Sequence, residues 1–460
     1  MRFWHTEALA NPGILLNLLL LAALLAIAAL LVRAIPPLRR LAVPRAIVAG
    51  LIGLSLGPSG ADLLPTDIPA MELIVYHAFA LMFIAGGLQS APVQKRPGAA
   101  RSFAVAGATI GVVQTILGLL FVAAWLSVER LHPAFGLMIM LGFQQGPGQA
   151  LSLGGAWESL GLVDGGQIGL VFATIGFLYC IVLGIPAVAI ARRRGLLTSA
   201  DMVAPSDPST TADASHGKRR GSVPTQLLWV GLVYAAVFAV ISGIVALLPS
   251  GSKLAATAWG MHFIFGSLLA IILRRSARRV HRDDSFDDAR LARLSVITVD
   301  ITTAGAFAAV RLEVLTTWLL PILLMTLMAG GLTLLACMWL ARRAFPEAPF
   351  SHALVLFGTG TGTVSTGLAL LRMLDPELRG TVARNAVIGA TVSVPFNAPM
   401  FVGVIPFAAT QWSGDMTMAI GAPLAVLAVY LVALLVSFRL FTPLRLLRPL
   451  RSVWPPVPDE

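Results

Sequence analysis

The feature that most constrains this chain is its series of long apolar segments. Stretches of about 20 residues with almost no charge recur from one end to the other, and a helix of about that length crosses the hydrocarbon core of a bilayer. Of the 460 residues 57% are hydrophobic and 12% are charged, whereas soluble domains carry about 25% charged residues. The sequence therefore predicts an all-α polytopic membrane protein.

Eleven segments are expected to cross the membrane as full helices, and two more are interrupted by polar or glycine-rich residues. The first is too long for a signal-peptide core and lacks a cleavage pattern, so we expect it to remain as a span. A polar stretch at 192–223 is expected to be a flexible cytoplasmic linker. The expected crossings are 14–32, 44–61, 71–91, 102–127, 167–191, 224–248, 255–273, 293–311, 314–341, 386–410 and 416–438, and the interrupted segments are 134–160 and 349–374.

The basic residues predict the orientation of the chain. The formal net charge is +11, but Arg and Lys cluster in short loops between apolar segments, where they set topology, so we expect no nucleic-acid partner. All these clusters fall on one side if segment 134–160 re-enters from outside and segment 349–374 from inside. The N-terminus is then external and the C-terminus cytoplasmic. The preference for Arg over Lys suggests a GC-rich bacterial genome, so the expected location is a bacterial inner membrane.

The two halves share one order of segments. Five spans and one interrupted segment precede the linker and the same set follows it, and an odd number of crossings inverts the second copy. Residues 170–176 and 387–393 occupy corresponding places after the two interruptions. We therefore expect a first repeat at 1–191, the linker, a second repeat at 224–410, and an additional span with a basic tail at 411–460. Inverted repeats with broken helices are typical of secondary transporters.

The interruptions are Gly142-Phe-Gln-Gln-Gly-Pro-Gly-Gln149 and Gly358-Thr-Gly-Thr-Gly-Thr-Val-Ser-Thr366. Non-helical backbone inside a bilayer must be satisfied by protein or line a water-filled cavity, so we read both as tips of re-entrant hairpins. Freed N–H groups at a half-helix N-terminus suit a carboxylate, while carbonyl and hydroxyl oxygens suit Na⁺. The alternative is that Gly and Thr only permit close helix packing. The candidates are Gln144, Gln145, Gly146, Gly148, Gln149, Thr361 and Thr363 for substrate and Thr359, Ser365 and Thr366 for the cation.

Three polar residues inside or beside spans are further candidates. Asp300 is an intramembrane acid that could ligate a cation or exchange a proton, or could be held by a structural ion pair. Arg311 could clamp a substrate carboxylate or simply extend to the lipid headgroups. Asn397, between Pro395 and Pro399, marks a broken helix whose freed carbonyls could bind a cation, or merely a kink.

The order of these features resembles the bacterial glutamate:sodium symporter family. The resemblance rests on Ala42-Val-Pro-Arg-Ala-Ile-Val-Ala-Gly50, on Phe135 to Trp157, on Ala173-Thr-Ile-Gly176 and on Phe357-Gly-Thr-Gly-Thr-Gly362, and it covers roughly residues 35–410. It implies sodium-coupled transport of an amino acid, a basic residue at the position of Arg311, and a homodimer. Two features depart from it: a Gln-rich first tip replaces a Ser-Gly-Gly-His type of turn, and the last span is additional.

We therefore expect a secondary active transporter that moves glutamate or a similar small carboxylate with Na⁺ by alternating access. The alternative within transport is a proton- or cation-coupled antiporter that uses Asp300. A channel is another possible class, and so is a lipid-modifying membrane enzyme. The sequence offers no cluster of nucleophile, base or metal ligands, so an enzyme is not expected. Cys180 and Cys337 lie in apolar segments of opposite halves and form no metal or disulfide pattern.

Overall fold

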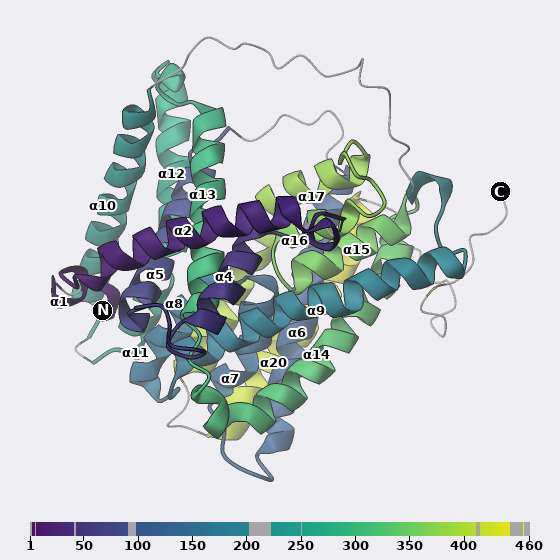
Figure 1. Ribbon diagram of the computed structural model, residues 1–460. Coiled ribbons are helices and arrows are strands. Elements are labelled where there is room, and N and C mark those ends of the chain that lie inside the picture. The colour runs from purple at the N-terminus through teal and green to yellow at the C-terminus, as the bar shows by residue number, and fades with distance from the viewer. Residues whose placement is uncertain are drawn as a thin grey trace.

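The computed structural model describes residues 2–4, 6–40, 43–90, 98–201, 222–249, 251–410, 415–441 and 454, and this part of the chain is helical without strands (Figure 1). Eight of its helices are long and apolar enough to cross a membrane, or ten if each of two bent helix pairs is one span. The predicted all-α polytopic architecture is confirmed.

The first half contains α2 (Gly13–Ala34), α3 (Pro36–Arg40), α4 (Arg45–Leu56), α5 (Ile68–Gly87), α6 (Gly98–Trp125), α7 (Pro133–Ile139), α8 (Pro147–Trp157) and α9 (Gly165–Arg193). The second half contains α10 (Val223–Leu247), α11 (Lys253–Gly260), α12 (His262–Arg279), α13 (Asp288–Ala308), α14 (Val314–Ala344), α15 (Pro349–Gly360), α16 (Val364–Leu371), α17 (Thr381–Thr391), α18 (Val394–Pro399) and α19 (Ile405–Thr410), followed by α20 (Met416–Phe441). Of the predicted linker, residues 202–221 lie outside the described part of the chain, as does the basic tail from 442 except for Trp454.

The number of full crossings differs from the prediction of eleven. The segment at 44–61 contains only the 12-residue α4, about 18 Å long, because the helix ends at Leu56 before the sequence Gly57-Pro58. The segment at 255–273 is bent by 59° between α11 and α12. The segment at 386–410 is bent by 49° and continues through a π-helical turn, Met400–Val404. Ten crossings at most are therefore present among the described residues.

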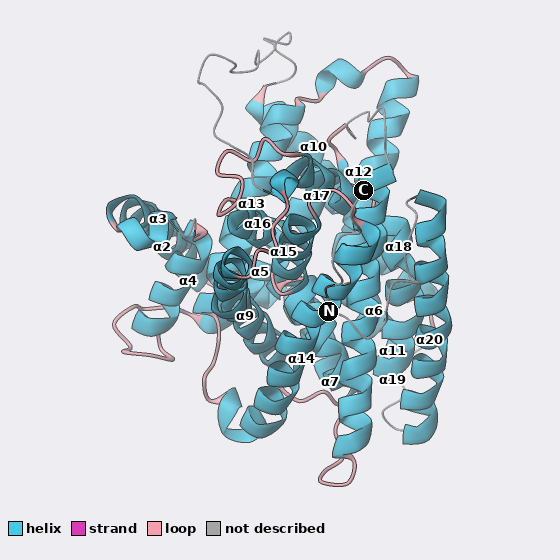
Figure 2. Ribbon diagram, turned by 90° about the vertical axis from the view of Figure 1, so that its right-hand side faces the viewer, coloured by secondary structure: helices cyan, strands magenta, loops and turns pink. Residues whose placement is uncertain are grey.

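Several of the helix–helix contacts have a counterpart made by the corresponding helices of the other half. α4 packs on α13 while α12 packs on α5, and α2 packs on α4 while α10 packs on α12. Likewise α6 packs on α7 and α14 on α15, and α9 contacts α14 as α17 contacts α6. α20 packs on α6, and Figure 2 shows it on the flank opposite to α2, α3 and α4. Such pairing is what a duplicated unit produces, although the boundaries of the two repeats remain a prediction.

Both interrupted segments fold as helix–break–helix units. In the first, α7 continues into a π-helical turn (Met140–Gln144), and the chain then breaks at Gly146, whose φ of 88° and ψ of 175° are accessible essentially only to glycine. Pro147 begins α8 because a first-turn residue needs no N–H donor. In the second, α15 ends at Gly360 and α16 begins after Thr363, which forms a capping box with Thr366.

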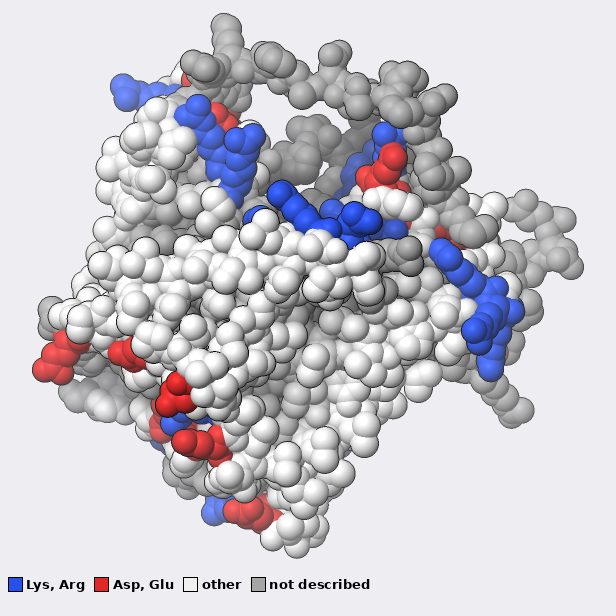
Figure 3. All heavy atoms as spheres, in the orientation of Figure 1, with Lys and Arg blue, Asp and Glu red and all other residues white. Residues whose placement is uncertain are grey.

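Charged side chains are unevenly distributed over the molecular surface. In Figure 3 most of the visible Lys and Arg side chains lie along the upper and right part of the face, and the left and lower edge carries mainly Asp and Glu, with a few charges of the opposite sign in each region. The broad white surface between them is uncharged. This separation matches the asymmetry that basic cytoplasmic loops would produce, while the orientation of the termini remains a prediction.

Candidate functional site

The tips of the two helical hairpins meet. A Cβ atom added to Gly146 at the first tip would lie 3.8 Å from Thr363 Cγ2 at the second tip. A cavity of about 490 Å³ lies beside this contact, and its other walls come from α5, α6, α12, α13, α17, α18 and the π-helical turn after α18. This volume is within the range of sites for small molecules, about 300–1,000 Å³.

Most of the residues predicted from the two interruptions line this cavity. They are separated by more than 200 positions in sequence, yet the fold brings both groups to one space. The residues of the two interruptions in the lining are Gln144, Gln145, Gly146, Gly148, Gln149, Thr359, Thr363 and Ser365. Asn397, predicted from the break between Pro395 and Pro399, lines the cavity as well.

Two predicted residues of the second tip do not line the cavity and instead hold the turn together. Thr361 is fully buried, and its hydroxyl donates to the carbonyl of Phe357 at 2.9 Å. The Thr366 hydroxyl accepts from the backbone N–H of Thr363 at 2.8 Å and lies 2.8 Å from the carbonyl of Gly358. These hydrogen bonds are local, so the structure gives both side chains a role in shaping the tip.

The two charged candidates also lie outside the cavity lining. Asp300 Oδ2 accepts from Nε and Nη2 of Arg45 at 2.8 and 2.6 Å, which joins α13 to the start of α4. Arg311 lies beyond the end of α13, and its guanidinium is 3.3 Å from Asp164 Oδ1, just before α9. Neither residue is brought to the hairpin tips, because each is held by an oppositely charged partner elsewhere in the fold.

Four buried oxygen atoms in residues that line the cavity have no hydrogen-bond partner. They are Gln144 Oε1, Gln149 Oε1, Thr302 Oγ1 and Thr359 Oγ1. The orientation of the Gln144 amide is fixed, because its Nε2 donates to the Gly107 carbonyl at 2.5 Å. Gln144 Oε1 lies against Gly111 of α6 and Thr359 Oγ1 against Gly367 of α16, and neither glycine lines the cavity. A buried polar group without a partner costs about 1–3 kcal/mol, so Gln149 Oε1 and Thr302 Oγ1 are the two atoms for which a ligand or water in the cavity would supply the missing interaction.

Backbone donors complement these oxygen atoms. The first hydrogen bond within α8 is from Ala150 N–H to the Gly146 carbonyl at 3.2 Å, so the N–H groups of Gly148 and Gln149 have no intrahelical acceptor. In α16 the first such hydrogen bond is from the Gly367 N–H to the Thr363 carbonyl at 3.0 Å. The N–H group of Ser365 therefore also lacks an intrahelical acceptor. The N-terminal, electropositive ends of two half-helices therefore lie at one cavity. No residue in its described lining is ionisable.

Sequence reasoning missed several residues that shape this site. Gln114 of α6 donates from Nε2 to the Gly360 carbonyl at 2.7 Å and to Thr333 Oγ1 at 3.1 Å, which anchors the end of α15. Thr302 of α13 and an aromatic wall that includes Phe79 and Phe263 complete the lining. A glutamine within an expected span was a usable signal, because polar groups at that depth are costly and therefore informative.

No protein-family model matches this chain, and no curated protein is significantly similar to it. What the site does must therefore be argued from its geometry.

Proposed function

We propose that this protein is a secondary transporter for a small solute that carries a carboxylate, with an amino acid such as glutamate as the first candidate and Na⁺ as the coupled ion. The observation that carries the proposal is the cavity shared by the two hairpin tips, with two half-helix N-termini and the unpartnered oxygen atoms of Gln149 and Thr302 in its lining residues. The order of sequence features that resembles the glutamate:sodium symporters supports the same conclusion.

The groups at the cavity suit the two ends of an amino acid. Since no ionisable side chain lines it, the carboxylate would be bound by the N–H groups of Gly148, Gln149 and Ser365 together with the positive ends of α8 and α16. The unpartnered carbonyl oxygen of Gln149 accepts hydrogen bonds, and an ammonium group donates them.

A hard cation would find oxygen donors in the same cavity. Thr359, Ser365 and Asn397 line it, and the Thr359 hydroxyl has no partner. Na⁺ is bound in such transporters by carbonyl and hydroxyl oxygens near broken helices. We assign these three residues to the coupled ion, which is cargo here, and leave Thr366 out because its hydroxyl is engaged in the tip.

The proposal is tested by ligand-dependent unfolding of the purified full-length protein in detergent. Amino and dicarboxylic acids are screened with and without Na⁺, and a ligand at one hundred times its Kd should add about 2.7 kcal/mol of stability. Gln149→Leu should stabilise the unliganded protein by about 1–3 kcal/mol, because it removes a buried oxygen without a partner, and should abolish the response to ligand. Gln89→Leu, at the end of α5 and outside the cavity lining, is the matched control.

If no acid shifts the unfolding transition at high Na⁺, the transporter proposal loses its support. If Gln149→Leu instead destabilises the protein and leaves ligand binding unchanged, the unpartnered amide is not part of the site.

The antiporter alternative, with Asp300 as the titrating group, has weaker support. An antiporter carboxylate must be reached by the transported cation, whereas Asp300 is paired with Arg45 and does not line the cavity. Proton dependence in place of Na⁺ dependence of uptake would favour it.

A further inference from the structure

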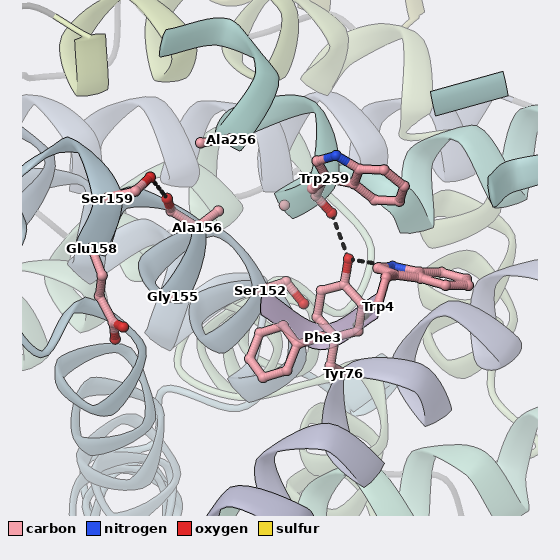
Figure 4. Close-up of a pocket in the computed structure, with 11 residues that line it drawn as sticks. Phe3, Trp4, Tyr76, Ser152, Gly155, Ala156, Glu158, Ser159, Ala256 and Trp259 are labelled. Carbon is pink, nitrogen blue, oxygen red and sulfur yellow. Dashed lines mark hydrogen bonds between the residues drawn. The ribbon is translucent and has the colours of Figure 1, made fainter. Parts of the chain in front are cut away.

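A second cavity of about 230 Å³ lies at the other end of α8, and Figure 4 shows its lining. Phe3, Trp4, Tyr76 and Trp259 form an aromatic wall, and the Tyr76 hydroxyl donates to the Trp259 carbonyl at 2.7 Å. Ser152 lies between the rings of Phe3 and Tyr76 in this view. The proposed function uses none of these groups.

The same three structural elements line both cavities in succession. Along α5, Tyr76 faces the second cavity and Phe79 the first. α8 presents Ser152 to the second cavity and Gly148 to the first. Across the α11–α12 bend, Trp259 belongs to the second cavity and Phe263 to the first. Since a helix rises about 1.5 Å per residue, the members of each pair are at most about 4.5–6 Å apart along their element. The two cavities are therefore consecutive spaces along one path.

A layer of aromatic rings closes the path between them. The Phe79 ring lies directly against Gly148, where an added Cβ would be 2.3 Å from Phe79 Cδ2. Phe79 and Phe263 have ring centroids 5.0 Å apart, and the Tyr76 and His262 rings stack at 3.8 Å. This layer joins α5 to α12, and its Phe79 ring also lies against α8 at Gly148.

The second cavity lies on the side away from the basic residues. α12 runs from the cavities toward Arg278 and Arg279 in its last turn, and Trp259 is farther from that end than Phe263. α5 likewise places Tyr76 farther from its C-terminal end than Phe79. Because basic loops stay cytoplasmic, the second cavity belongs to the external side.

The lining of the second cavity includes a buried hydroxyl group, that of Ser152, without a hydrogen-bond partner. Ser152 is fully buried. Gly155 and Ala156 of α8 and Ser159 of the following 3-10 turn add small side chains to the lining. Glu158 also lines the cavity, and its carboxylate accepts from the backbone N–H of Gly166 at 3.1 Å. A hydroxyl among aromatic rings suits a small polar solute with an apolar part.

We propose that the second cavity is the external vestibule of the transport route and binds the same class of solute, a small amino or carboxylic acid, before it reaches the hairpin tips. The barrier between vestibule and site is the aromatic layer of Phe79 and Phe263. This inference rests on the proposed function, since it assigns a route to the same cargo.

Cysteine labelling tests the route without requiring a known substrate. The two native cysteines, Cys180 and Cys337, are buried and give a low background. A membrane-impermeant methanethiosulfonate applied outside intact cells should modify Ala156→Cys in the full-length protein. Ser267→Cys, which lines the first cavity, is the matched control and should react at least tenfold more slowly. Adding Phe79→Ala to Ser267→Cys should open the barrier and raise its external labelling at least tenfold.

Two results would overturn the inference. One is an Ala156→Cys variant that reacts only after denaturation, and the other is a Ser267→Cys variant labelled equally fast from outside with Phe79 intact. If Phe79→Ala fails to accumulate, Phe79→Leu makes a smaller opening and the same comparison applies. Failure of the transporter proposal would be seen separately, as normal labelling with no acid that stabilises the protein.

Discussion

The most informative single substitution is Gly146→Ala at the first hairpin tip. Gly146 has φ of 88° and ψ of 175°, a backbone region that is essentially limited to glycine. Space is not the obstacle, because the nearest atom to an added Cβ is Thr363 Cγ2 at 3.8 Å, an ordinary contact distance. The substitution therefore isolates backbone strain from steric collision.

The magnitude follows from that strain. A non-glycine residue held in a sparsely populated region costs about 1–3 kcal/mol. We expect Gly146→Ala to lower the free energy of unfolding by that amount if the tip keeps its shape. If the tip relaxes instead, the N–H groups of Gly148 and Gln149 move away from the cavity, and each 1.4 kcal/mol lost weakens ligand binding about tenfold.

The assay is equilibrium unfolding in mixed micelles together with ligand affinity. Gly107→Ala is the matched control, because Gly107 also lines the cavity but lies within α6, and its added Cβ would be 3.9 Å from Gln144 Nε2. Alanine is favoured over glycine in a helix by up to about 1 kcal/mol, so this variant should be as stable as the parent or more stable. Equal stability and affinity for Gly146→Ala and the parent would refute the reasoning about the tip.

Three further predictions concern residues outside the cavity lining. Burial lowers the pKa of His132, before α7, from 6.5 to about 4, so its neutral form contributes stability that is present above pH 6.5 and lost as the pH falls toward 4. His132→Asn keeps an acceptor for the Ala134 N–H and should remove about 3 kcal/mol of this pH dependence in thermal unfolding, and an unchanged profile would contradict the assignment. Asp300→Asn should lower the free energy of unfolding by at most about 1 kcal/mol, because its partner Arg45 is half exposed. The Na⁺ dependence of uptake should stay unchanged, and a loss of cation dependence would restore the antiporter interpretation. Gln114→Leu removes the amide donor to the Gly360 carbonyl and to Thr333 Oγ1, so it should lower the free energy of unfolding by about 1–3 kcal/mol. It should also weaken ligand binding, although Gln114 does not line the cavity. Unaltered affinity would show that the end of α15 needs no anchor.

The hairpin breaks could be predicted because their signals are local. Gly146 supplies a positive φ and Pro147 starts a helix, and both effects depend only on the residue itself. The short α4 could also have been foreseen, since Gly57-Pro58 follows it directly in sequence and ends helices. The predicted span of 44–61 was too long because it was based only on the length of the apolar stretch, whereas the helix ends at Leu56.

The charged candidates could not be placed from sequence because their partners are remote. Arg45 is 255 positions from Asp300, and Asp164 is 147 positions from Arg311. Which basic residue meets which acid depends on how α4 packs on α13 and where α9 begins, and these are tertiary contacts. An ionisable residue in a span signals that a partner exists without identifying it.

The absence of ionisable side chains from the described lining of the hairpin cavity has an electrical consequence. A binding site that contributes no charge of its own carries none when it changes its exposure from one side of the membrane to the other. If the protein transports as proposed, the charge that this site moves in each cycle is then the charge of the cargo alone. In proteoliposomes, the ratio of transport current to solute flux would count the accompanying cations directly, and it should stay constant with pH as long as the solute keeps one protonation state.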